Sequence, residues 1–335
     1  MKYHKTLLLM MALMSAISVS AQQAGLKALG LNLENYDYPF DVNYLSLDSQ
    51  NESYQMAYMD VRPAKPNGKA VLLLHGKNFN GAYWRETATL LAAEQGFRVI
   101  IPDQIGFGKS SKPEHYQYTF QQLAANTKAL LDTLRIEKIA VLGHSMGGML
   151  ATRFALMYPE QTDQLILVNP IGLEDWKLKV PYKPVEWWYA NELGKTYEGI
   201  RKYQLESYYD NQWKPEYDEW VNLLAGWTLN IDYPRIAWNA ALTYDMIFTQ
   251  PVCYEFKHLE APTLLIIGQR DRTALGKPLV SDEVRATMGN YPELGKRTQQ
   301  QIPNARLVEL DDIGHLPHIE AFDRFIGPLV EFLNQ

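Results

Sequence analysis

Residues 138–149 read KIAVLGHSMGGM, and the rest of the chain can be placed around this stretch. Residues 139–142 form a short apolar run of the kind found in buried strands. Residues 143–147 then fit the pattern G-x-S-x-G, and the apolar residues of 149–156 recur with helical spacing. The stretch therefore predicts a strand, a sharp turn and a helix, with Ser145 at the turn.

The two glycines of this pattern suit a turn of that kind. A tight strand-to-helix turn forces its central residue into a strained backbone conformation. Gly143 and Gly147 remove side chains that would clash there. The hydroxyl of Ser145 then stands exposed above the sheet, beside the free N–H groups that begin the helix. For the five residues alone, an ordinary glycine–serine turn is the alternative interpretation.

The composition of the chain is ordinary for a soluble enzyme. It has 335 residues, of which 47% are hydrophobic and 21% charged, and its net charge is −6. This length allows a large core with one inserted subdomain. The chain has no basic runs, so the composition argues against nucleic acid as a partner.

The first 21 residues differ from the rest. Lys2 and Lys5 precede an apolar stretch over 7–19, which is too short for a comfortable membrane span, and small residues follow at 19–21. Residues 1–21 are therefore expected to be a signal peptide of an exported, periplasmic protein whose mature chain has no stable membrane insertion. An uncleaved anchor is the alternative. Cys253 is the single cysteine, so no disulfide can form within the chain.

Beyond a leader over 22–40 with some helical character, the chain alternates between strands and helices. Residues 43–47 and 54–61 predict an antiparallel hairpin. Further strands are expected at 70–74, 97–103, 139–142, 164–169, 262–268 and 306–310, and helices at 83–93, 120–134 and 319–333. This order predicts the α/β class, with a mainly parallel sheet covered by helices on both faces.

Residues 172–256 interrupt that alternation. They are dense in Trp and Tyr, have helical periodicity and contain no convincing buried strand. We expect a helical cap over 172–256, inserted into a core of residues 22–171 and 257–335. Aromatic residues at helical spacing chiefly pack the cap itself, but so aromatic a lid favours an apolar or aromatic substrate moiety.

A serine hydroxyl becomes a nucleophile when a base lies within hydrogen-bond reach and an acid orients that base. His315 follows the last predicted strand, and the carboxyl ends of parallel strands share one edge of a sheet. His315 and Ser145 can therefore meet. His318 competes for this role, but Gly314 permits a close turn before His315, and His318 is expected to begin a helix.

Asp271 is the expected acid, because it directly follows the strand over 262–268 and reaches the same edge. The alternative is an exposed loop carboxylate that pairs with Arg270 or Arg272. Glu174 and Asp175, which follow the strand over 164–169, are the second-choice acids.

An oxyanion needs backbone N–H donors aimed at the developing charge. Met146 supplies one donor as the residue after the serine. The second is expected after the strand over 70–74, from Lys77 or, as second choice, Asn78. His75 and His144 are expected to hold loops and packing in place and to have no catalytic role.

Five segments carry a joint resemblance to the α/β-hydrolase fold family. They are HGKNFNG (75–81), PDQIGFGKSSKP (102–113), GHSMGG (143–148), GQRDRT (268–273) and DIGHLPHIE (312–320). The resemblance implies Ser145 as nucleophile, His315 as base and Asp271 as acid, with no metal or cofactor. Relatives that cleave carbon–halogen bonds or epoxides carry Asp at the elbow, so a serine favours acyl transfer. The segment after His75 also lacks the glycine-rich run common in lipases and C–C bond hydrolases.

The sequence thus predicts a serine hydrolase of the carboxylic ester type that acts on a small, apolar ester through an acyl-enzyme. Three alternatives remain within enzymes: a proline iminopeptidase-like activity, a C–C bond hydrolase, and a cofactor-free haloperoxidase-like activity. Outside enzymes, the alternative is a non-catalytic ligand-binding protein on the same fold.

Overall fold

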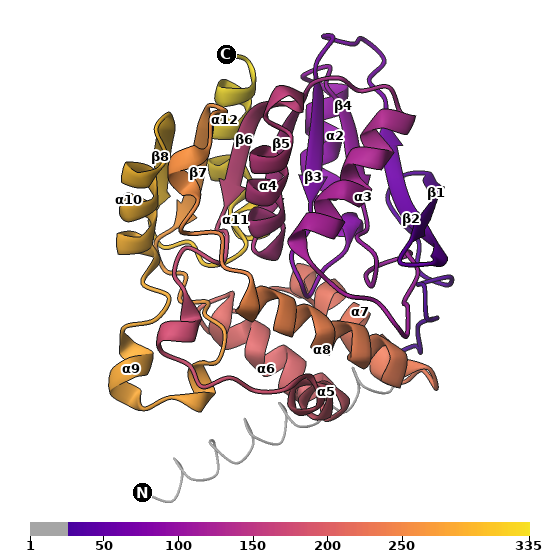
Figure 1. Cartoon of the computed structure of the whole chain (residues 1–335), viewed down its shortest axis with the longest axis vertical. Helices are drawn as coiled ribbons and strands as arrows, with labels where there is room; N and C mark the ends of the chain where they lie inside the picture. The colour runs from indigo at the N-terminus through magenta and orange to yellow at the C-terminus, as the bar shows by residue number, and fades with distance from the viewer. Residues whose placement is uncertain (1–25) are drawn as a thin grey trace, which may run out of the picture.

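A computed structural model describes residues 26–335 of the protein (Figure 1). The predicted signal peptide, residues 1–21, lies outside the described residues. One eight-stranded sheet runs through the described chain in the order β1-β2-β4-β3-β5-β6-β7-β8. Its strands are β1 (Val42–Ser49), β2 (Glu52–Val61), β3 (Ala70–Leu74), β4 (Arg98–Pro102), β5 (Ile139–His144), β6 (Thr162–Val168), β7 (Thr263–Gly268) and β8 (Ala305–Leu310).

The predicted hairpin is present at one edge of this sheet. Strands β1 and β2 pair antiparallel from Val42 opposite Met59 to Ser49 opposite Glu52. Gln50 and Asn51 form the turn with φ of 54° and 66°, the left-handed conformation that two-residue hairpins favour. Strand β2 then pairs antiparallel with β4, and all pairings from β4 to β8 are parallel.

Helices cover both faces of the sheet, which confirms the predicted fold class. Helices α2 (Arg85–Ala93) and α12 (Phe322–Leu333) pack into the hydrophobic cluster of one face. Helices α3 (Phe120–Thr133), α4 (Met146–Met157) and α10 (Tyr291–Gln301) pack into the cluster of the other. Thr119 caps α3, because its hydroxyl accepts the Gln122 N–H at 2.9 Å. Strands β5 and β7 are buried along their whole length.

Four helices lie together beyond the carboxyl ends of the parallel strands, in the lower part of Figure 1. They are α5 (Val185–Leu193), α6 (Tyr197–Ser207), α7 (Asp218–Thr228) and α8 (Tyr233–Thr249), and we call them the lid. The most extensive contact among them is between α5 and α8. The lid therefore covers the edge of the sheet at which the predicted functional residues lie.

Shorter elements complete the described chain. They are α9 (Asp282–Ala286), α11 (Pro317–Glu320) and 3₁₀ turns at Gly81–Trp84, Pro159–Gln161, Trp176–Leu178, Pro215–Tyr217, Phe256–His258 and Lys277–Leu279. The closing helix expected over 319–333 is divided, because the backbone of Ala321 leaves the helical conformation between α11 and α12.

The expectation of helical character before the hairpin is wrong for the residues described, 26–40, which form turns and extended backbone. Some of their backbone groups bond within the segment, as the Leu33 N–H does to the Gly30 carbonyl, and others bond to the lid. The N–H of Leu29 donates to the Gly226 carbonyl at 3.0 Å, and the indole of Trp227 donates to the Gly30 carbonyl at 3.0 Å. Leu33 is fully buried there. This N-terminal segment therefore packs on the lid and stabilises it.

Candidate active site

The strand–turn–helix predicted around Ser145 is present as β5, a single turn residue and α4. Ser145 has φ 55° and ψ −121°, a conformation that side chains rarely adopt. A Cβ at position 143 would lie 2.0 Å from the Gly147 carbonyl oxygen, and one at 147 would lie 2.2 Å from that of Leu74. Both glycines are therefore required by close backbone approach, as the sequence predicts.

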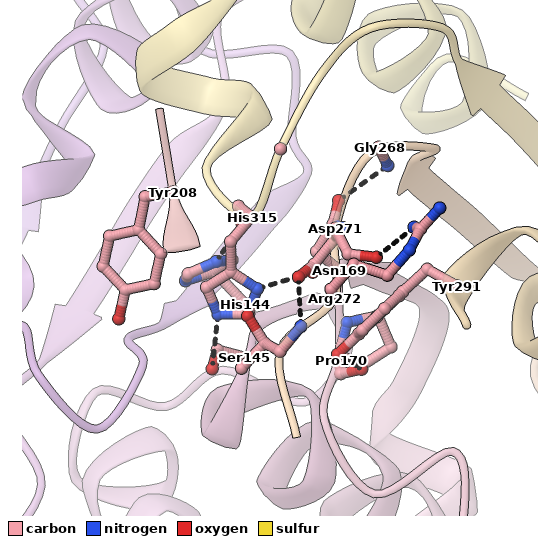
Figure 2. A network of polar contacts seen from close by, with 12 residues as sticks. His144, Ser145, Asn169, Pro170, Tyr208, Gly268, Asp271, Arg272, Tyr291 and His315 are labelled. Atoms are coloured by element: carbon pink, nitrogen blue, oxygen red, sulfur yellow. Dashed lines mark hydrogen bonds and ion pairs between the residues drawn. The ribbon is translucent and has the colours of Figure 1, made fainter. Parts of the chain in front are cut away.

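Ser145, His315 and Asp271 lie together in an unbroken line of hydrogen bonds (Figure 2). The hydroxyl of Ser145 lies 3.0 Å from Nε2 of His315, and Nδ1 of His315 lies 2.6 Å from Oδ2 of Asp271. These partners assign the ring proton to Nδ1 and leave Nε2 as an acceptor for the serine proton. The three side chains come from the ends of β5, β8 and β7, so the shared sheet edge brings them together.

Asp271 is fully buried and held by more than the histidine. Its Oδ1 accepts the Thr273 N–H at 2.7 Å, and its Oδ2 accepts the side-chain amide of Asn169 at 2.8 Å. Burial alone would raise the pKa of Asp271, but the adjacent His315 and the Thr273 hydrogen bonds lower it overall. The carboxylate is therefore ionised at neutral pH and able to orient and stabilise the imidazole.

The backbone of His315 is positioned by a second, buried histidine. Nε2 of His144 donates to the His315 carbonyl at 2.8 Å, and Nδ1 accepts from the Tyr83 hydroxyl at 2.9 Å. The same hydroxyl accepts the Gly76 N–H at 2.8 Å. Burial holds the pKa of His144 well below its usual range, so the ring stays neutral. His144 is thus a packing and positioning residue, as expected.

The loop after β3 reaches the serine. A Cβ on Gly76 would lie 3.1 Å from Cβ of Ser145, so the backbone of this loop passes directly beside Ser145. Lys77 and Asn78 line the same cavity as Ser145. Met146 begins α4 and is fully buried. Residues 77 and 146 therefore belong to the two segments that adjoin Ser145.

The other histidines and carboxylates considered lie elsewhere. His318 is in α11, stacked on Trp84 with ring centroids 4.4 Å apart, and burial lowers its pKa to about 3. His75 accepts the Gln104 N–H at 3.1 Å and so joins two loops. Glu174 pairs with Lys179, and Asp175 caps the short helix at 176–178. None of these four side chains contacts Ser145 in the described structure.

A cavity of about 440 Å³ lies between Ser145 and the lid. Its walls are chiefly apolar and aromatic, and they come from the loop after β3, the segment after β6, the lid and the segment after β7. The lining aromatic residues are Phe79, Trp176, Trp188, Tyr203, Tyr208 and Tyr244. His315 and Ser145 form part of the lining, so the hydrogen-bonded line opens directly into this cavity.

Two residues of the site were missed at the sequence level. Asn169 holds Asp271 and also accepts the Gly268 N–H at 2.9 Å, and its φ of 37° is strained. It follows β6 at the same sheet edge, so the strand-end argument could have found it. Tyr208 stacks on His315 with centroids 5.2 Å apart and planes inclined by 21°. Nothing in the sequence places this lid residue over the histidine.

Among residues 26–335, no group of three or more His, Cys, Asp or Glu side chains is arranged to hold a metal ion. In the same residues, no helix is both long and apolar enough to cross a membrane.

Comparison with known proteins gives a single family. The family model described as alpha/beta hydrolase fold matches residues 69–322. The crystal structure of a probable hydrolytic enzyme from Pseudomonas aeruginosa superimposes with a TM-score of 0.91 at 53% identity, covering 92% of this chain and 99% of that one.

Relatives with named activities either have a lower sequence identity to this chain or match a smaller part of it. The cis-3-alkyl-4-alkyloxetan-2-one decarboxylase of Shewanella oneidensis is 25% identical over 289 residues, 80% of this chain and 83% of that protein. The 2-hydroxy-6-oxo-6-phenylhexa-2,4-dienoate hydrolase of Burkholderia cepacia is 40% identical over 110 residues, 32% of this chain and 38% of that protein. The first curated relatives matched, uncharacterised mycobacterial proteins, are covered over only 30% of their length.

Proposed function

Because the chain belongs to the α/β-hydrolase fold family, we propose that it is a hydrolase that cleaves a small ester, with Ser145 as nucleophile, His315 as base and Asp271 as orienting acid. The observation that carries this proposal is the line of contacts of 3.0 Å and 2.6 Å joining the three side chains. A serine so placed has both the base and the orienting acid that nucleophilic catalysis needs.

The geometry supports a two-step reaction. Ser145 Oγ attacks the ester carbonyl while its proton passes to Nε2 of His315. The oxyanion forms beside the backbone N–H groups of Met146 and Lys77, each donor contributing roughly 3–4 kcal/mol of transition-state stabilisation. His315 then protonates the departing alcohol, and water, activated by the same ring, releases the acid from Ser145. Asp271 stays ionised throughout and stabilises the imidazolium.

The cavity supports a small substrate with substantial apolar surface. Its volume of about 440 Å³ lies within the range of small-molecule sites. The aromatic lining of the lid favours an apolar or aromatic acyl or alcohol group.

Cleavage of a carbon–carbon bond is the second candidate, favoured by the similarity to the Burkholderia dienoate hydrolase. The matched region covers about a third of this chain. Turnover of that relative's named substrate faster than any ester would replace the ester proposal by this one.

The direct test is hydrolysis of 4-nitrophenyl acetate and butyrate by the mature protein. Ser145→Ala should lower kcat by on the order of 10³-fold or more, because no other group can form the acyl-enzyme. A fluorophosphonate probe should label Ser145 in the wild type and leave the variant unlabelled. Equal inertness of wild type and variant, without labelling, would refute the proposal.

A further inference from the structure

The cavity next to Ser145 contains charge of one sign. Lys77 and Lys195 are among its lining residues, and the lining includes no aspartate or glutamate within the described chain. Positive side chains in an otherwise apolar and aromatic pocket are expensive unless an anion compensates them. The two lysines therefore point to a ligand that brings negative charge into the pocket.

One carboxylate, Glu192, stands behind the lining, and it is already engaged. It is buried and pairs with Lys195 at 2.8 Å. The Lys77 ammonium group lies instead over the ring of Tyr244, 3.5 Å from its centroid. Within residues 26–335 no carboxylate is within ion-pair distance of Lys77. When Lys77 is charged, two lysines and one glutamate thus leave one positive charge without an ion-pair partner in the cavity that Ser145 lines.

A second observation points to a ligand. Gln204 of α6 is among the cavity-lining residues and is 99% buried, and neither its amide nitrogen nor its amide oxygen has a hydrogen-bond partner in the described structure. A buried amide without partners costs about 1–3 kcal/mol per group. A polar substrate atom in the cavity would remove that cost.

We propose that the substrate carries a carboxylate group distinct from the bond that is cleaved, and that Lys77 binds this carboxylate under the lid. Lys195 stands nearer the solvent, with 30% of its side chain exposed, and attracts the anion toward the pocket. Gln204 supplies hydrogen bonds to a further polar atom of the substrate. A single uncompensated positive charge matches a carboxylate, whereas a phosphate monoester carries nearly two negative charges at pH 7. The inference rests on the hydrolase function proposed above.

The charge state of Lys77 gives the preference a pH dependence. Burial lowers the pKa of Lys77 to about 7, while Glu192 opposes and Lys195 adds to this shift, and the facing Tyr244 is neutral because burial raises its pKa. Below pH 7 the lysine is charged and binds the anion. As pH rises above 7, free enzyme loses that charge, so kcat/KM for a carboxylate substrate should fall relative to a neutral one.

The test compares esters in pairs that differ by one carboxylate. Mono(4-nitrophenyl) glutarate against 4-nitrophenyl valerate places the anion on the acyl side. 4-Acetoxybenzoate against its methyl ester places it on the alcohol side. At pH 6.5 the wild type should prefer the anionic member of at least one pair by about tenfold or more in kcat/KM. A preference for the neutral ester in both pairs would overturn the proposal.

Variants show whether Lys77 is responsible. Lys77→Met should reduce the anionic-to-neutral ratio about tenfold, chiefly through KM of the anionic ester, and remove its pH dependence, and Lys77→Arg should restore part of the ratio. The control is Lys202→Met on α6, because Lys202 is 72% exposed and pairs with Glu206 at the surface. An unchanged ratio in Lys77→Met would contradict the assignment.

Calorimetry separates this inference from the proposed function. Titration of Ser145→Ala with mono(4-nitrophenyl) glutarate and with 4-acetoxybenzoate should show, for at least one of them, binding that is at least tenfold weaker in the Ser145→Ala, Lys77→Met double variant. This readout needs no turnover, so it holds even if the wild type hydrolyses none of the four esters and no fluorophosphonate labels Ser145, which together would refute the hydrolase function alone. Equal affinities in the single and double variants would refute the carboxylate site alone.

Discussion

At the scale of single residues, the site depends on how Asp271 is surrounded. Its Oδ2 accepts from both His315 and Asn169, whereas its Oδ1 accepts from the Thr273 N–H. An asparagine here would place its amide nitrogen at the Oδ1 position, where only one donor opposes it. The histidine would then keep an oxygen partner and its tautomer, but it would lose the negative charge.

Asp271→Asn is therefore expected to lower kcat by on the order of 10³-fold, with KM changed little, because the lost charge acts on the imidazolium of the transition state. Steady-state hydrolysis of 4-nitrophenyl butyrate measures this. Asp175→Asn, in the second-choice acid, serves as control and should retain kcat within about twofold. Comparable losses in both variants would contradict the role proposed for Asp271.

The residues that could be predicted from sequence are those fixed by strand ends. Ser145, His315 and Asp271 each follow a parallel strand, so the fold alone brings them to one edge. Tyr208 and Gln204 could not be predicted, because their positions depend on how the lid packs over that edge. The local sequence of α6 shows a helix but not its partner.

At the scale of elements, the elbow is a contact between backbones. The first turn of α4 lies against the end of β3, and Gly147 is the residue at which they meet. The helix itself would favour alanine at this position by about 1 kcal/mol. The close approach of the Leu74 carbonyl favours glycine at this position instead.

Gly147→Ala is expected to destabilise the protein by at least about 2 kcal/mol, since the new carbon would lie 2.2 Å from that carbonyl oxygen. Gly327→Ala is the matched control in helix α12, where the added carbon meets no atom within 4 Å. Urea unfolding curves of both variants measure the difference. A midpoint for Gly147→Ala equal to that of the control would show that the elbow can relax.

Element types followed from sequence more reliably than element ends. The hairpin, the parallel strands and α3 lie where local patterns predict them. Local patterns did not predict that the closing helix is divided at Ala321 or that residues 26–40 form no helix. In the second case tertiary hydrogen bonds to Gly226 and Trp227 replace the local ones that a helix would make.

At the scale of the whole molecule, the N-terminal segment connects two layers. Leu29 and Leu33 pack with Trp227 of the lid. Farther along, the Tyr38 hydroxyl donates to Asp103 at 2.7 Å, and Asp103 also accepts the Gly81 N–H at 2.7 Å in the core. The segment therefore contacts both the lid helices and the core.

Deletion of residues 26–37 from the mature chain should lower Tm by roughly 5–15 °C, because two buried leucines worth about 1.5–3 kcal/mol each lose their contacts. Scanning calorimetry measures this, and trypsin should then cleave the lid faster than the core. Removal of the exposed Asn334 and Gln335 is the control and should leave Tm within about 1 °C. An unchanged Tm after the N-terminal deletion would show that the lid needs no such fastening.

The position of the C-terminus has a practical consequence. The chain ends after α12 at the end of the molecule away from α5–α8 (Figure 1). A purification tag or a covalent linker placed after Gln335 therefore projects away from the route by which substrate reaches Ser145. Protein immobilised on a resin through this end presents its lid to the passing solution, which suits it to flow assays of substrate panels.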